Sequence, residues 1–136
     1  MKTGNGGGAR IQHHWQLEVY QLSMQASREV FQLTKTFPKE ELYSLTDQIR
    51  RSSRSISAQL AEAWRRRKYE AVFVNKLNEA EGEAAETQVW LQHAFDCEYV
   101  SATRARELHR LYNRILGKLT KMGNEPEKWV LRPKSA

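Results

Sequence analysis

Apolar and small residues recur every three or four positions over most of the chain, which is the spacing of one face of an α-helix. The most regular run lies between residues 69 and 95, where these positions alternate steps of four and three, as in a heptad repeat. They are Phe73, Leu77, Ala80, Ala84, Thr87, Leu91 and Ala94. The pattern predicts one long helix over residues 69–95.

Three further segments show the same spacing and predict helices over residues 18–36, 38–66 and 101–122. Their expected inward positions are Val19, Leu22, Ala26, Val30, Leu33; Leu42, Leu45, Ile49, Ser52, Ile56, Leu60, Ala63; and Ala105, Leu108, Tyr112, Ile115, Leu119, Met122. Small side chains such as Ser52 allow a neighbouring helix to come close. We therefore expect the second helix to be central to the packing.

Residues near the expected helix ends carry boundary signals. Pro38 suits a first helical position, and Glu40 and Glu41 follow where the helix dipole favours carboxylates, so the second helix is expected to begin at about Pro38. Ser101 suits the N-cap of the fourth helix, and Gly123 suits the left-handed position past its end.

The expected fold is all-α. No alternating run bounded by turn residues is present, so strands are not supported. Four helices with short links predict an antiparallel up-and-down four-helix bundle. We expect a flexible N-terminal segment over residues 1–14, the bundle domain over residues 15–123 and a C-terminal tail over residues 124–136. In that tail Trp129, Val130 and Leu131 are expected to dock on the bundle or on a neighbour.

Length and composition exclude several classes. A chain of 136 residues is the size of one domain and can bury a core without metal or disulfide support, and its one cysteine excludes an intramolecular disulfide. No segment has the apolar length of a signal peptide or of a membrane span. We expect a soluble, cytoplasmic protein with no membrane partner.

Charge is arranged in blocks along the chain. Residues 50–68 carry seven basic residues against Glu62, residues 79–98 carry six acidic residues and no Lys or Arg, and residues 101–121 carry six basic residues against Glu107. In the last block the basic positions follow helical steps, which places them in a ridge on one side of the fourth helix.

Two interpretations of these blocks stay open. Acidic and basic helices can pair within the bundle or between subunits, where exposed ion pairs contribute about 0–1 kcal/mol each. Alternatively the basic residues contact phosphate, which the arginine fork matches. The candidate nucleic-acid-binding residues are Arg65, Arg66, Arg67, Lys68, Arg106, Arg110, Arg114, Lys118 and Lys121. Trp64 and Tyr69 flank the first four, either as helix-end packing residues or as stacking platforms for an unpaired base.

No catalytic, cofactor-binding or metal-binding constellation is evident in the sequence. None of the four histidines follows a Glu by three residues, as carboxylate-bridged metal bundles require, and no phosphate-cradling glycine loop or nucleophile elbow is present. The sequence therefore predicts a protein that is not an enzyme and needs no cofactor.

Two sequence motifs resemble a known family. They are FPKEELYSLTDQIRRSSRSISAQLAEA over residues 37–63 and FVNKLNEAEGEAAETQVWL over residues 73–91. Both are similar to the signature of the small bacterial four-helix-bundle proteins first recognised as reading frames inside 23S ribosomal RNA intervening sequences. The family-motif residues singled out are Phe37, Pro38, Glu41, Gln48, Arg50, Arg51, Ser55, Ile56, Glu62 and Glu86.

The resemblance implies a homopentamer of bundles arranged as a ring around a central channel. It also implies relatedness to the accessory variability determinant proteins of diversity-generating retroelements, which bind nucleic acid and a reverse transcriptase. The chain departs from the family pattern at Ser53, Gln59, Ala63 and Glu83. Ala63 replaces a glycine at the turn after the second helix, so that helix is expected to continue into the basic run from Arg65.

The leading hypothesis is a non-enzymatic oligomeric module that binds RNA or DNA through its basic surfaces, with a reverse transcriptase as a further candidate partner. The alternative is a protein-interaction scaffold without a nucleic-acid ligand, whose charge blocks pair subunits and a partner.

Overall fold

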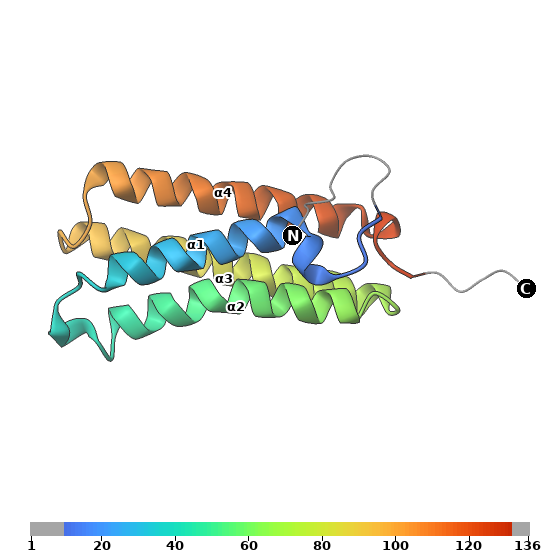
Figure 1. The fold of residues 1–136 in the computed structure, drawn as a ribbon, viewed down its shortest axis with the longest axis horizontal. Helices are drawn as coiled ribbons and strands as arrows, with labels where there is room; N and C mark the ends of the chain where they lie inside the picture. The colour runs from blue at the N-terminus through green and yellow to red at the C-terminus, as the bar shows by residue number, and fades with distance from the viewer. Residues whose placement is uncertain (1–9, 132–136) are drawn as a thin grey trace, which may run out of the picture.

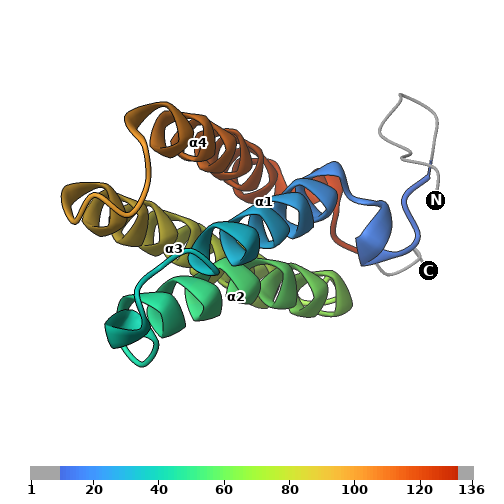
Figure 2. The same cartoon turned by 60° about the vertical axis from the view of Figure 1, so that its left-hand side comes forward.

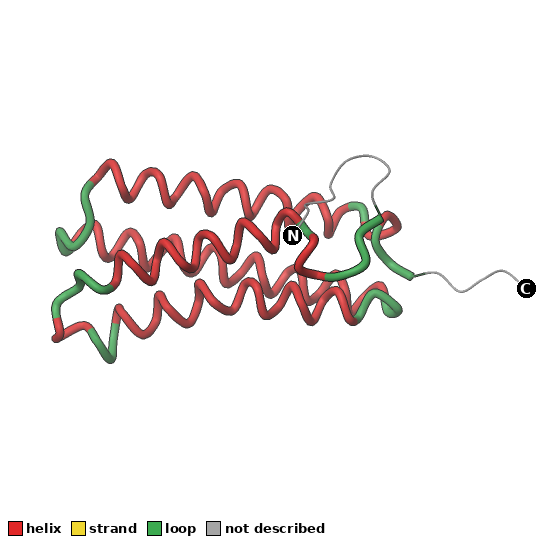
Figure 3. Tube along the Cα trace, in the orientation of Figure 1, coloured by secondary structure: helices red, strands yellow, loops and turns green. Residues whose placement is uncertain are grey.

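The computed structural model describes residues 10–131, which form four α-helices, three short 3-10 helices and no strand (Figure 3). The α-helices are α1 (Glu18–Thr34), α2 (Leu45–Arg65), α3 (Glu70–Asp96) and α4 (Ala102–Asn124). The 3-10 helices are η1 (His14–Gln16), η2 (Lys39–Glu41) and η3 (Pro126–Lys128). The expected all-α class is confirmed for this part of the chain.

The four helices lie side by side in a bundle (Figures 1 and 2). α1 contacts α2 and α4, and α3 contacts the same two helices, so each helix has two neighbours. The α1–α2 and α3–α4 links meet at one end, where the Tyr99 hydroxyl donates a hydrogen bond to Glu41 Oε2 at 2.9 Å. The α2–α3 link and the two terminal segments lie at the other end.

The core consists of the positions that the periodicity marks. All seven expected positions of α3, from Phe73 to Ala94, are buried. In α4 the positions from Leu108 to Met122 are buried as well, and Tyr112 is fully enclosed. The heptad pattern therefore identified the inner faces of these two helices correctly, since it reports burial directly.

Small residues bring α2 and α3 together at the centre of the bundle. Ser52 is 3% exposed and Thr87 is fully buried, and the Thr87 hydroxyl donates a hydrogen bond to Ser52 Oγ at 2.8 Å. The two hydroxyls also lie within hydrogen-bond distance of carbonyls on their own helices, Ser52 Oγ of Ile49 at 3.4 Å and Thr87 Oγ1 of Glu83 at 2.8 Å, so these buried polar atoms are satisfied.

The expected start of α2 at Pro38 is wrong. Pro38 has extended backbone angles and precedes the 3-10 helix η2, and α2 begins only at Leu45. Glu41 Oε1 accepts hydrogen bonds from Ser44 Oγ at 2.6 Å and from the Leu45 amide at 3.4 Å. The motif therefore caps α2 from a preceding turn, and Leu42, expected inside, is 44% exposed.

Other helix ends match the expected ones to differing degrees. Ser101 is confirmed as the N-cap of α4, because its Oγ accepts a hydrogen bond from the Arg104 amide at 3.1 Å. Gly123 is not a left-handed stop, since α4 continues to Asn124. α2 ends at Arg65 despite the replacement of glycine by Ala63, so it does not extend through the whole basic run.

The terminal segments pack on the bundle where they are described. Trp64 Nε1 donates a hydrogen bond to the Gln12 carbonyl at 3.0 Å. Trp129 and Val130 pack against the core, whereas Leu131 is 55% exposed. The expected flexible segment over residues 1–14 lies outside the described residues up to residue 9, as does the tail beyond residue 131. Between residues 10 and 131, no helix is both long and apolar enough to cross a bilayer.

Candidate nucleic-acid interface

The outer side of α4 carries a row of arginines that is open to solvent. Arg106, Arg110 and Arg114 are exposed, and Lys121 continues the row towards the C-terminal end of the helix. Within residues 10–131 these four side chains take part in no hydrogen bond or ion pair. Lys118 differs, because its Nζ lies 2.7 Å from Glu18 Oε1 on α1. We call Arg106, Arg110, Arg114 and Lys121 the α4 ridge.

The link between α2 and α3 carries the second basic group. Arg65, Arg66 and Lys68 are exposed. Arg67 is partly buried, with its guanidinium 3.6 Å from the centre of the Trp64 ring and its Nε donating to the Trp64 carbonyl at 2.8 Å. Burial, and secondly the charge of Arg65, lowers the pKa of Arg67. Of the four sequence candidates here, Arg67 therefore has a structural role. We call Arg65, Arg66 and Lys68 the basic link.

Of the two flanking aromatic residues, only one can reach a ligand. Trp64 is 4% exposed and packs edge-on against Trp129, with ring centres 6.2 Å apart. The packing interpretation is therefore correct for Trp64. Tyr69 is 58% exposed, so a stacking role for its ring stays a prediction.

The C-terminal segment joins the two basic groups at one end of the bundle. The Leu131 amide donates a hydrogen bond to the Arg67 carbonyl at 2.9 Å. Earlier in the same segment, Trp129 and Lys128 line a depression together with Lys121 of α4. The basic link and the C-terminal end of the α4 ridge are therefore bridged by residues 125–131. Lys128 adds no free cation there, because its Nζ lies 3.2 Å from Glu125 Oε2.

The acidic block of α3 does not neutralise these groups. The ion pairs between different helices are Lys76 with Glu62, Arg104 with Glu29 and Lys118 with Glu18, within the part of the chain that the structure describes. None of them joins an acidic residue of 79–98 to the α4 ridge or the basic link. Burial, followed by the charge of Glu86, raises the pKa of Glu83, whereas the charge of Arg51 acts in the opposite direction. A salt-bridged seam within the bundle therefore does not account for the charge blocks.

Most family-motif residues serve the fold. Phe37 is buried beside Tyr99, with ring centres 5.4 Å apart. The Arg50 Nε donates to Thr34 Oγ1 at 2.8 Å, and its guanidinium lies 4.8 Å from the centre of the Phe31 ring. Of the other motif residues, Ile56 is buried and Arg51 is exposed. Glu62 forms an ion pair with Lys76. The half-buried residues are Pro38, Gln48, Ser55 and Glu86.

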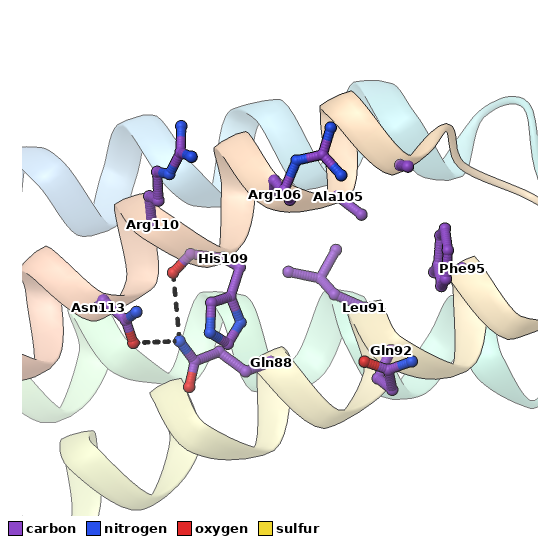
Figure 4. Close-up of a pocket in the computed structure, with 10 residues that line it drawn as sticks. Gln88, Leu91, Gln92, Phe95, Ala105, Arg106, His109, Arg110 and Asn113 are labelled. Atoms are coloured by element: carbon purple, nitrogen blue, oxygen red, sulfur yellow. Dashed lines mark hydrogen bonds between the residues drawn. The ribbon is translucent and has the colours of Figure 1, made fainter.

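A groove between α3 and α4 was not anticipated from the sequence. It has a volume of about 540 Å³ and lies between Phe95 of α3 and the α4 residues Arg106, His109 and Arg110 (Figure 4). The sequence signal was the pair of small residues Ala102 and Ala105, which stand opposite the bulky side chains of α3. Within residues 10–131, the groove included, no group of three His, Cys, Asp or Glu side chains is placed to hold a metal ion.

Comparison with known proteins places the chain among helical relatives. Residues 15–121 match the family model described as 23S rRNA-intervening sequence protein. The chain is also similar to a 1.70 Å crystal structure from Bacteroides thetaiotaomicron VPI-5482, described as a protein with unknown function from the S23 ribosomal protein family. That similarity has 29% identity and a TM-score of 0.71, covering 78% of this chain and 95% of the other. No curated protein matches the chain.

Proposed function

The chain belongs to the 23S rRNA-intervening sequence protein family, as its two motifs indicated, and we propose that it is a non-enzymatic module that binds nucleic acid through basic surfaces. RNA is the first ligand to test because of the family to which the chain belongs. The observation that carries the proposal is the α4 ridge, whose cations are exposed and have no partner within residues 10–131.

The geometry of the α4 ridge suits a phosphate backbone. Arg106, Arg110 and Arg114 follow one another at four-residue steps, and each step advances about 6 Å along the helix axis. Long arginine side chains at such intervals can meet successive phosphates, and each contact releases counterions from the nucleic acid. Such contacts are independent of base sequence, so we propose binding without strong sequence preference.

Assembly would multiply these contacts. We propose that the antiparallel up-and-down bundle forms a ring-like homopentamer, in which five copies of a chain with net charge +6 carry a formal charge of +30. Several weak phosphate contacts would then act on one strand at once. Five chains of 15.9 kDa give a mass of about 80 kDa. Sedimentation equilibrium that returned the monomer mass at all accessible concentrations would refute the ring.

The test of binding is a salt series with labelled RNA and DNA, each single-stranded and duplex. The affinity should fall linearly with salt on logarithmic axes, because counterion release drives binding. Absence of binding at low salt, or binding without a salt slope, would refute the proposal. A reverse transcriptase is the protein partner to test next, because the family resemblance implies relatedness to the accessory proteins of retroelements.

The alternative is a scaffold that binds a protein and no nucleic acid. The observation in its favour is the acidic block of α3, which makes no ion pair with the α4 ridge or the basic link within residues 10–131, although its Glu79 pairs with Lys76 on the same helix at 3.3 Å. Reversal of the basic link in the variant Arg65→Glu, Arg66→Glu, Lys68→Glu separates the two. Loss of a measured nucleic-acid affinity in this variant would contradict a scaffold-only function. Unchanged nucleic-acid binding would show that the basic link does not contact the nucleic acid.

A further inference from the structure

The α3–α4 groove has the form of a bounded hollow. At one end the Gln88 side-chain amide on α3 donates hydrogen bonds to the His109 carbonyl at 3.2 Å and to Asn113 Oδ1 at 2.8 Å. At the other end the Phe95 side chain rises from the last turn of α3 (Figure 4). The hydrogen bonds hold the two helices together beside the hollow, so its shape is set by the fold.

The floor of the groove is apolar at Leu91 and Ala105, whereas Gln88, Gln92, His109 and Asn113 add polar side chains to its lining. Leu91 lies at its base with Ala105 across from it (Figure 4). Because Ala102 and Ala105 are small, α4 leaves open space opposite the Phe95 ring, which is 41% exposed. A volume of about 540 Å³ lies within the range of roughly 300–1,000 Å³ that is usual for small-ligand sites.

The rim of the groove is cationic on the α4 side. Arg106 and Arg110 border the hollow and point away from α3 in the close-up (Figure 4). Neither guanidinium has a hydrogen bond or ion pair among residues 10–131. The α3 side carries Asp96, whose Oδ1 accepts a hydrogen bond from Gln92 Nε2 at 2.8 Å. Anionic groups of a ligand are therefore expected along α4.

The groove combines an exposed aromatic ring, a hollow with an apolar floor and polar amides, and two arginines without a partner in residues 10–131, which together match the chemistry of a nucleotide. The base of a nucleotide has a flat face that stacks on aromatic side chains. The phosphates are joined to the sugar and therefore lie away from the stacked base. We propose that the groove receives one unpaired base of a single-stranded nucleic acid, stacked on Phe95, with Arg106 and Arg110 holding the adjoining phosphates. The inference rests on the proposed nucleic-acid function and adds a preference for single strands.

The experiment compares two labelled single strands with the same number of phosphates, one intact and one abasic at every position, in fluorescence anisotropy titrations. The wild-type protein should bind the intact strand about 5- to 160-fold more tightly, as expected for one stacked base. Phe95→Ala should abolish this ratio and leave the affinity for the abasic strand and its salt slope unchanged. Val89→Ala, at another exposed apolar residue of α3 outside the groove, is the matched control and should retain the ratio.

A second variant keeps the stacking ring and fills the hollow. Ala105→Trp should also remove the preference for the intact strand and should prevent the quenching of a fluorescent base analogue placed in the strand. If the wild-type protein bound intact and abasic strands equally, with the expected salt slope, the groove would not be a base-binding site and the proposed nucleic-acid function would stand. Absence of binding to either strand at low salt would overturn both. A base preference that survives in Phe95→Ala would also refute the groove.

Discussion

Neutralising the α4 ridge should change the salt dependence of binding by a predictable amount. The variant is Arg106→Gln, Arg110→Gln, Arg114→Gln, which removes three charges that have no partner within residues 10–131. Each phosphate contact adds about 0.7 to the salt slope for a single strand, so the slope should fall by roughly 2 for each engaged chain. Between 50 and 200 mM salt, the wild-type protein should therefore lose roughly twentyfold more affinity than the variant.

The assay is anisotropy of a labelled single strand at four or more salt concentrations. The matched control is Arg104→Gln on the same helix, because the Arg104 guanidinium already lies 2.8 Å from Glu29 Oε1 and carries little free charge for a ligand. Its slope should equal that of the wild-type protein. The triple variant should stay folded, since exposed substitutions usually change stability by less than about 0.5 kcal/mol. Arg104 is half-buried and its substitution breaks the ion pair with Glu29, so the Tm of the control is measured beside its salt slope. A triple variant with the full wild-type slope would show that the α4 ridge does not contact phosphate.

Three further predictions concern the fold that supports this surface. Thr87→Val should lower the free energy of unfolding by about 1–2 kcal/mol in urea denaturation, because Ser52 Oγ loses the buried hydrogen bond from Thr87 and keeps only its longer one to the Ile49 carbonyl. The double variant with Ser52→Ala should cost less than the two single changes together, and strict additivity would contradict this coupling. The pKa of Glu41 lies below its ordinary 4.5, firstly because Ser44 and secondly because Tyr99 donate hydrogen bonds to the carboxylate. The hydrogen-bonded carboxylate therefore stabilises the fold at pH values above the pKa of Glu41 in the unfolded chain, and this stabilisation is lost as the pH falls through the lower pKa of the folded protein. In the variant Glu41→Gln, Tm should therefore fall less steeply as the pH is lowered. An unchanged decrease of Tm at acid pH would contradict this role of Glu41. Arg67→Ala should shift tryptophan emission to longer wavelength and lower stability by roughly 1 kcal/mol, since the guanidinium covers the Trp64 ring. Arg66→Ala is its control, and equal effects of the two changes would refute a structural role for Arg67.

Burial explains why the helices were predictable from the sequence. The seven positions from Phe73 to Ala94 face the core along one helix, and periodicity records that directly. The start of α2 was not predictable in the same way. Glu41 acts as its cap from an earlier turn and is held by Tyr99, which lies 58 residues further along the chain. Local signals around Pro38 contain no information about that distant partner.

The candidate site was only partly predictable, for a related reason. Arg66 and Arg67 are neighbours in sequence, yet only Arg67 turns back over Trp64, because α2 ends between Arg65 and Arg66. The basic composition of the segment could not distinguish them. The groove beside Phe95 depends on which residue of α4 stands across from it, and this follows from the packing of α3 against α4 and not from either helix alone.

The hydrogen bonds of Gln12 to Trp64 and of Leu131 to Arg67 have a practical consequence for anyone who handles the protein. Both ends of the described chain converge on the α2–α3 link, beside the basic link. A purification tag or a fused domain joined directly to residue 10 or to residue 131 would therefore start close to Arg65, Arg66 and Lys68. A polyhistidine or acidic tag there would alter the local charge, so affinities for nucleic acid should be compared between tagged and cleaved protein.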